Sequence, residues 1–329
     1  MSAAVRAKRW LDPTALRNLF RDRPLIPLTG LLLVLVVAVE LSSPGTVSVH
    51  WAGVILRQSV PLAILGGCQT LAMLTGGIDL SVASIASMAG FVTATFVHSP
   101  GGWPQGIAVA LAAAALAGLV TGIGVGVFRV HPLIMTLAMS FVVLGFSNVW
   151  QLRMVQTGAG VPAELRWLGS NLLWDVIPYS LLVFVPLTLL ILLGLRRTGY
   201  GRLLFAIGDN PVAARLSGAR SWQVLIVLYV ISAVLAGIAG LILSGYSNTA
   251  SVSLADQYLL PSVAAAVIGG TSIMGGRGGF SGTIVGAIIL MVLGALLTDL
   301  GLPEPWRQVV FGSIIVVMAA AYTRVTAEY

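Results

Sequence analysis

Charged side chains are scarce in this chain. Its 329 residues include 18 Lys and Arg and 11 Asp and Glu, which make up 9% of the total, whereas soluble domains carry roughly 25%. Apolar residues account for 57%. There are too few charges to cover a soluble globule of this size, so composition excludes a soluble enzyme, a nucleic-acid-binding protein and a disordered chain. The apolar runs are long and continuous rather than alternating, which favours a helical membrane protein over a transmembrane barrel.

Cysteine and recognisable catalytic patterns are equally sparse. Cys68 is the only cysteine, so no intrachain disulfide can form, and its apolar neighbours indicate a small buried side chain. No histidine shows metal-ligand spacing. The sequence contains no G-x-x-x-x-G-K-[ST] phosphate loop, no G-x-S-x-G elbow and no His–Glu zinc pattern. We therefore expect no catalytic residues, no metal and no cofactor in this chain, and no means of hydrolysing ATP by itself.

The apolar runs predict an all-α polytopic membrane protein with one transmembrane domain over residues 25–323. A span needs about 20 predominantly apolar residues. Ten spans are the expected count, with nine or eight as alternatives, because some segments are short or follow each other with almost no polar break. We expect broken or short helices among them. The predicted spans are 25–42, 52–75, 78–98, 105–128, 132–152, 174–195, 222–245, 259–274, 280–299 and 306–323.

The distribution of Lys and Arg predicts the orientation. With ten spans and a cytosolic N-terminus, 14 of the 18 basic residues fall on the cytosolic side. Residues 1–24 are then a cytosolic or interfacial segment, either an amphipathic helix on the membrane or a loose tail, and residues 324–329 are a cytosolic tail. The net charge of +7 follows from this bias toward an anionic leaflet and needs no nucleic acid to explain it.

Two glycine-containing segments interrupt the apolar runs and contain polar residues. Asp79 lies in GGIDLS at 76–81, where paired glycines permit the backbone to leave the helix. A carboxylate at this depth is costly unless it is paired, caps a helix or faces water. We leave two roles open: Asp79 and Ser81 cap the next helix, or they line or gate a polar pathway. The second break, 269–279, reads as a tight connection with Arg277 at the cytosolic surface. The pathway or helix-break candidates are Gly77, Asp79, Ser81, Thr271 and Ser272.

The largest polar loop on the predicted cytosolic side is 196–221. Asn210 and Pro211 read as the N-cap and first residue of a short helix over 211–217, and Gly218 as the residue after its end. Val212 and Leu216 lie on one face of it. Such a small apolar helix either docks in a groove of a partner protein or lies on the lipid surface.

Four blocks of the sequence resemble the ribose-type sugar permeases of ABC importers. They are LTGGIDLSVAS at 74–84, PLIMTLAMSFVVLGFSNV at 132–149, GRLLFAIGDNPVAARLSG at 201–218 and AAVIGGTSIMGGRG at 265–278. The blocks follow the order of that family. The third looks like its ATPase-coupling loop, which assigns the coupling role to Gly201, Arg202, Gly208, Asn210, Ala213, Ala214, Arg215, Leu216, Ser217 and Gly218. The chain departs from many members at Ala83 and over 256–261.

The resemblance implies a permease subunit of an importer for a monosaccharide, such as ribose or a similar pentose or hexose, in the bacterial inner membrane. It implies a second permease subunit, identical or closely related, that forms the other half of the pathway. It also implies a cytosolic ATPase, often with two nucleotide-binding halves, which holds the ATP and magnesium, and an extracytoplasmic sugar-binding protein. The alternatives are a permease of the branched-chain amino acid type, an ion-coupled secondary transporter and an intramembrane enzyme.

Overall fold

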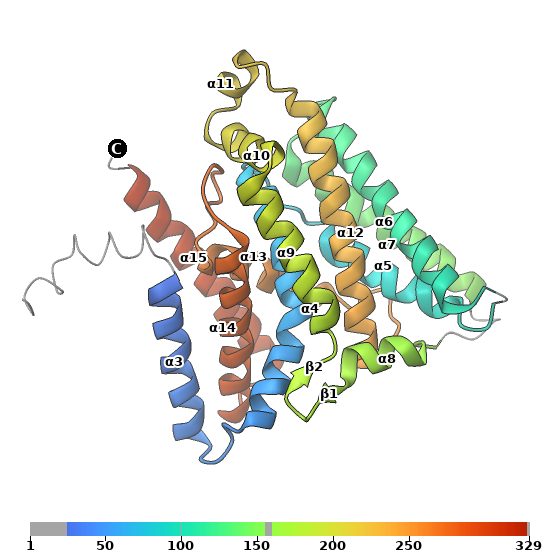
Figure 1. Cartoon of the computed structure of the whole chain (residues 1–329), viewed down its shortest axis with the longest axis vertical. Coiled ribbons are helices and arrows are strands. Elements are labelled where there is room, and N and C mark those ends of the chain that lie inside the picture. The colour runs from blue at the N-terminus through green and yellow to red at the C-terminus, as the bar shows by residue number, and fades with distance from the viewer. Residues whose placement is uncertain (1–24, 100, 155–159, 328–329) are drawn as a thin grey trace, which may run out of the picture.

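The computed structural model describes residues 25–99, 101–154 and 160–327. The segment 1–24, predicted to lie on the membrane surface or in the cytosol, is outside these ranges. The described residues form a bundle of mostly long helices (Figure 1). In chain order the elements are α3 (Leu25–Ser42), α4 (Val49–Leu74), α5 (Val82–Thr95), α6 (Gly102–Gly126), α7 (Pro132–Met154), α8 (Ala163–Ser170), β1 (Leu172–Leu173), β2 (Ile177–Pro178), α9 (Leu181–Arg197), α10 (Gly199–Asp209), α11 (Pro211–Leu216), α12 (Ser221–Ser247), a 3-10 turn η1 (Asp256–Tyr258), α13 (Leu259–Ile268), α14 (Phe280–Asp299) and α15 (Glu304–Ala327).

The helix lengths confirm a polytopic helical membrane protein. Among the described residues, six helices are long and apolar enough to cross a membrane: α3, α4, α6, α7, α12 and α14. The pair α9 and α10 passes the same test together but is bent by 68°, which gives up to seven. Helix α5 has 14 residues and α13 has 10, so they measure about 21 and 15 Å at 1.5 Å per residue. Neither reaches across a hydrocarbon core of about 30 Å as a helix alone.

Three predicted spans are not continuous helices. Within 78–98 the helix covers only Val82–Thr95, and within 259–274 it covers only Leu259–Ile268. The predicted span 174–195 begins helical structure only at Leu181, because residues 172–178 form a two-stranded antiparallel hairpin. Trp174 and Asp175 both have positive φ in its turn. All three segments are apolar, and apolar content does not distinguish helix from buried extended backbone.

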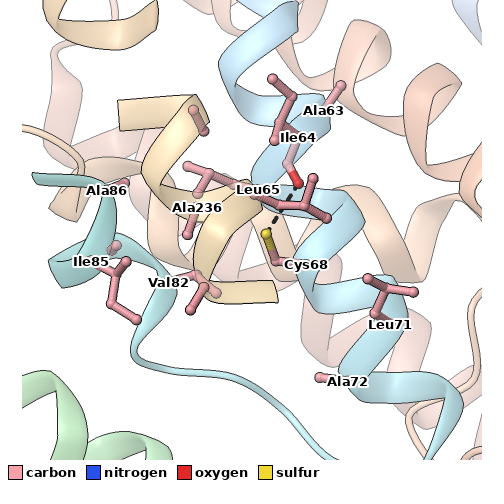
Figure 2. Close-up of a cluster of buried hydrophobic side chains, with 14 of the residues drawn as sticks. Ala63, Ile64, Leu65, Cys68, Leu71, Ala72, Val82, Ile85, Ala86 and Ala236 are labelled. Carbon is pink, nitrogen blue, oxygen red and sulfur yellow. Dashed lines mark hydrogen bonds between the residues drawn. The ribbon is translucent and has the colours of Figure 1, made fainter. Parts of the chain in front are cut away.

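Helices α4 and α12 lie at the centre of the bundle and pack against each other. Figure 2 shows their contact with α5 around Cys68, whose thiol donates to the carbonyl oxygens of Ile64 (3.4 Å) and Ser232 (3.2 Å). The side chain of Cys68 is fully buried, as predicted. Close packing of α6 on α12 depends on Gly118, where a Cβ atom would collide with the carbonyl oxygen of Tyr229.

The order of helix lengths repeats once along the chain. The long helix α4 is followed by a break, the short helix α5 and the long helices α6 and α7. The long helix α12 is likewise followed by a break, the short helix α13 and the long helices α14 and α15. Helix α4 packs on α13 and α14, and α12 packs on α5 and α6. Each central helix therefore supports the short helix of the other set.

The bundle has two distinct ends. At one end, which we call the α11 end, lie α10, α11 and the starts of α12 and α14, together with the end of α4 (Figure 1). At the other, the α8 end, lie α8, the hairpin, the start of α4 and the end of α12. Contacts of Gly53 with Val176 and of Gly169 with Tyr246 hold the α8 end together.

Candidate functional site

Asp79 lies in the non-helical segment between α4 and α5 and is 1% exposed. Its Oδ1 accepts hydrogen bonds from the backbone N–H (3.0 Å) and the hydroxyl (2.5 Å) of Ser81. Its Oδ2 accepts from the hydroxyl of Ser232 on α12 at 2.9 Å. Three donors thus converge on one buried carboxyl group, which offsets part of the cost of burying it.

The backbone around Asp79 is held by side chains from two other helices. The Gln69 amide on α4 forms a reciprocal pair with the Asp79 peptide: Nε2 donates to the carbonyl oxygen (2.8 Å), and Oε1 accepts from the N–H (3.2 Å). Thr136 on α7 accepts from the Leu80 N–H at 3.1 Å, and its hydroxyl lies 3.2 Å from the Ile78 carbonyl oxygen. These bonds replace those that a continuous helix would supply inside the bundle.

The capping hypothesis for Asp79 holds only in part. Its carboxylate does bind an N–H at the start of the helix, that of Ser81. Ser81 itself occupies the N-cap position of α5, but its side chain makes no capping bond and donates to Asp79 instead. The Asp79–Ser232 bond joins the break to α12, so the carboxylate links two elements rather than capping one.

The second glycine-rich segment, 269–279, closes into a compact loop. The Ser272 N–H donates to the Arg277 carbonyl oxygen (2.9 Å), and the Ser272 hydroxyl accepts from the Met274 N–H (3.1 Å). Thr271 and Ser272 are buried, whereas Arg277 is exposed, as predicted for a tight connection. The Gly276 N–H donates to the Leu74 carbonyl oxygen at 3.0 Å. The structure therefore brings the two glycine-containing breaks, and with them the two groups of pathway candidates, to the same end of the bundle.

The loop 196–221 consists of two helices outside the long spans. Thr198 caps α10 by accepting from the Gly201 N–H at 3.1 Å. Gly201 lies so close to the carbonyl groups of Gly194 and Leu195 that a side chain would collide with them, which keeps the bend between α9 and α10 tight. Arg202 is exposed on α10. This bend turns the chain out of the bundle and toward α11 (Figure 1).

The predicted short helix is present as α11, Pro211–Leu216. The Asn210 side chain accepts from the N–H groups of Val212 (3.0 Å) and Ala213 (2.9 Å), as expected of an N-cap. Gly218 follows the helix with a φ of 86°. Val212 and Leu216 are 54% and 85% exposed. Three other predicted coupling residues in or next to this helix are exposed: Ala213, Arg215 and Ser217. Ala214 is buried against the bundle.

A cavity of about 550 Å³ lies beside α11, between this helix, the second half of α10 and the start of α12. Its walls include Asn210, Ala213, Arg220 and Gln223. The exposed apolar side chains of α11 and the polar side chains that line this cavity therefore lie next to each other at the α11 end.

The site also contains residues that the sequence reasoning did not single out. Gln69, Thr136 and Ser232 hold the break at Asp79, and all three are buried. The available signal was their polarity within apolar segments, since polar groups at membrane depth need partners. Their pairing with Asp79 could not be read from spacing, because they come from three different helices.

These features define a polytopic membrane protein with broken helices in its core and a capped, exposed helix at one end. A family model described as "branched-chain amino acid transport system / permease component" matches residues 52–319. The ribose import permease protein of Escherichia coli K12 is 35% identical over 286 residues, covering 86% of this chain and 89% of its own length. The fructose import permease protein of Rhizobium meliloti is 32% identical over 273 residues, covering 81% and 76%.

A third relative, the galactofuranose transporter permease protein of Escherichia coli K12, is 32% identical over 262 residues, covering 79% of this chain and 76% of its own length. No solved structure matches the chain. The chain belongs to the family of ABC importer permeases that includes these three proteins.

Proposed function

We propose that the chain is the membrane-spanning permease subunit of an ATP-driven importer for a monosaccharide. The exposed, capped helix α11 carries this proposal, because a six-residue helix with two exposed apolar side chains outside the bundle is suited to insertion in a groove of another protein. The relatives named as ribose, fructose and galactofuranose permeases support the sugar.

The burial of charge favours a neutral substrate. Among the side chains that the structure describes, Asp79 is the one buried acidic or basic group. Both of its carboxylate oxygens are already engaged by Ser81 and Ser232. A branched-chain amino acid would need groups for its ammonium and carboxylate, and an ion-coupled transporter would need a second buried ionisable partner. A sugar needs neither.

The proposal assigns partners to the two ends of the bundle. A cytosolic ATPase, with ATP and magnesium in its own sites, docks on α11 and the predicted coupling residues around it. A sugar-binding protein docks at the α8 end, and a second permease subunit, the same chain or a close relative, completes the pathway. No nucleic acid is involved. The assembly lies in the cytoplasmic membrane of a bacterium.

The proposed topology has ten crossings and cytosolic termini. Seven are supplied by α3, α4, α6, α7, α9, α12 and α14. Helix α15, with 24 residues, supplies an eighth. In the remaining two a non-helical stretch and a short helix cross together: 75–81 with α5, and 248–258 with α13. Of the 12 basic residues after position 24, eight fall at the α11 end in this topology, which agrees with a cytosolic location for that end.

The experiment that tests the proposal replaces Leu216 by Asp. The chain is co-expressed with its ATPase and reconstituted with the binding protein in proteoliposomes. A charge in the docking groove should remove ATPase from the purified complex and reduce sugar uptake at least tenfold. Leu300→Asp is the matched control for ATPase binding and should retain the ATPase, because Leu300 is also exposed (58%) but lies at the end of α14, away from α11. Wild-type uptake by the Leu216→Asp complex would contradict docking through α11.

Single cysteines in a Cys68→Ser background test the topology. Labels at Arg197 and Ser221 should react with an impermeant maleimide only from the cytosolic side, and labels at Gly160 and Ser247 only from outside. Reaction of both pairs from one side would contradict the ten-crossing arrangement.

A further inference from the structure

Three segments of backbone meet at the α11 end of the bundle. They are the end of α4 at Leu74, the glycine loop at Gly275 and Gly276, and the end of α10 at Gly208. A Cβ atom at Gly208 would collide with the Leu74 carbonyl oxygen and lie 2.5 Å from the Gly276 nitrogen. No side chain therefore separates these three segments at their point of contact.

The contact is reciprocal. A Cβ atom at Gly275 would lie 2.8 Å from the Gly208 carbonyl oxygen and 3.1 Å from the Gly76 nitrogen. One at Gly276 would lie 3.0 Å from Cα of Asp209. Main chain packed against main chain has no rotamers to absorb a shift, so a displacement of one segment displaces the others. We call this contact the Gly208 junction.

The junction is connected to α11 by a short, stiff path. Asp209 ends α10, and the next residue, Asn210, caps α11 with two hydrogen bonds. Ala214 is buried against the bundle, which holds α11 on its inner side. Force applied to the exposed face of α11 reaches Gly208 through the capping residue Asn210 and the last residue of α10, Asp209.

The junction is also connected to both short helices. The segment 75–81 leads from Leu74 to α5, and the loop 269–279 leads from α13 to α14. Both are stretches of non-helical backbone that adjoin a short helix. Resting on the proposed function, we propose that Gly208 is a positioning residue for coupling: movement of α11 by the ATPase is passed through the Gly208 junction to both breaks at once.

The first experiment compares Gly208→Ala with Gly145→Ala. Gly145 lies on α7 with open space around it, so this control adds the same methyl group without a collision. Both complexes are assembled with the ATPase and the binding protein. We expect Gly208→Ala to keep ATPase bound and hydrolysing within twofold of wild type, while sugar imported per ATP falls at least tenfold. An unchanged ratio of sugar to ATP in Gly208→Ala would overturn the proposal.

The second experiment leaves Gly208 unchanged, so it tests the proposal even if the Gly208→Ala chain fails to assemble. Spin labels are placed at Ala206 on α10 and Met274 in the glycine loop, both exposed, in a Cys68→Ser background. A second pair joins Ala206 to Phe128, which lies beyond the end of α6 and is 74% exposed. On trapping the nucleotide-bound complex, the Ala206–Met274 distance should stay constant while the Ala206–Phe128 distance changes.

The alternative outcomes are distinct. A change in the Ala206–Met274 distance as large as that of the other pair, or no change in either pair, would overturn transmission through the junction. If the proposed function itself were wrong, the wild-type complex would neither retain the ATPase nor import the sugar, so the two failures are told apart by the wild-type control.

Discussion

The segments 75–81 and 269–279 are both non-helical, both contain paired glycines and lie at the same end of the bundle, yet they are held in different ways. The first is fixed by side chains that reach it from α4, α7 and α12. The second is fixed mainly by its own backbone, with positive φ at Gly270, Gly275, Gly276 and Gly278. Similar composition therefore produces one break that depends on polar side chains and another that depends on the absence of side chains.

The difference has a physical origin in what surrounds each segment. Asp79 is buried among three helices, so its peptide groups must find partners inside the bundle. The loop 269–279 reaches the surface at Met274 and Arg277, where water can satisfy its free groups, and its constraint is the close approach of α4 and α10. Substitutions should therefore affect the two segments differently. Loss of a polar side chain should destabilise 75–81, and added side-chain volume should destabilise 269–279.

The largest effect is expected for Asp79→Leu. It leaves the Ser81 N–H, the Ser81 hydroxyl and the Ser232 hydroxyl without their acceptor, and each buried unsatisfied donor costs about 1–3 kcal/mol. We expect a loss of at least about 3 kcal/mol in the free energy of unfolding, measured in mixed micelles. The yield of assembled complex should fall with it.

Asp79→Asn separates the polar from the charged role. The amide oxygen can still accept from Ser81, so the stability loss should be less than half that of Asp79→Leu. If the charge serves only to hold the break, sugar uptake per assembled complex stays at the wild-type rate. Slow uptake by a stable, assembled Asn variant would instead assign the carboxylate to the pathway. Equal stability of the Leu variant and wild type would contradict both roles.

The sequence predicted the long helices and the short helix α11 well because their signals are local. The range 280–299 agrees with α14 at both ends, and the range 25–42 ends with α3 at Ser42, since glycine or polar residues stand at these ends of the apolar runs. Asn210, Pro211 and Gly218 mark α11 by conformational preferences that act within a few residues. The structure also confirms the burial of Cys68.

The short helices could not be predicted in the same way. Ile78 and Leu80 are apolar and lie inside a predicted span, yet their peptide groups bond to Thr136, 58 and 56 residues away along the chain. Hydropathy records that a segment is buried but not which partner replaces its helical hydrogen bonds. The Gly208 junction could not be predicted from the sequence for the same reason, because it joins backbone atoms that are far apart along the chain. The functional roles of the coupling and pathway residues stay predictions.

The next largest effect is expected for Gly276→Ala, compared with Gly45→Ala. Both glycines have left-handed backbone, with φ of 70° and 85°, which costs an alanine about 1–2 kcal/mol. Gly45 has open space around it, whereas the new methyl at Gly276 would lie 3.0 Å from Cα of Asp209. Gly276→Ala should therefore lose more unfolding free energy than Gly45→Ala, and the difference measures the packing of the glycine loop on α10. Equal losses would show that this contact yields without cost.

The smallest effect is expected for Thr136→Val, which keeps the shape of a fully buried side chain but removes the acceptor of the Leu80 N–H. Thr121→Val on α6 is the control, because the Thr121 hydroxyl only donates to the carbonyl oxygen of Ala117 in its own helix. Loss of an acceptor for a buried N–H costs about 1–3 kcal/mol. Because Leu80 is only partly buried, the cost of Thr136→Val should lie near the lower end of this range. Hydrogen exchange should sharpen the result: the Leu80 amide should exchange at least tenfold faster in Thr136→Val and at an unchanged rate in Thr121→Val. Unchanged exchange in both variants would mean that Gln69 and Ser232 hold the segment 75–81 without α7. Fewer side chains would then support this segment than the comparison of the two segments implies.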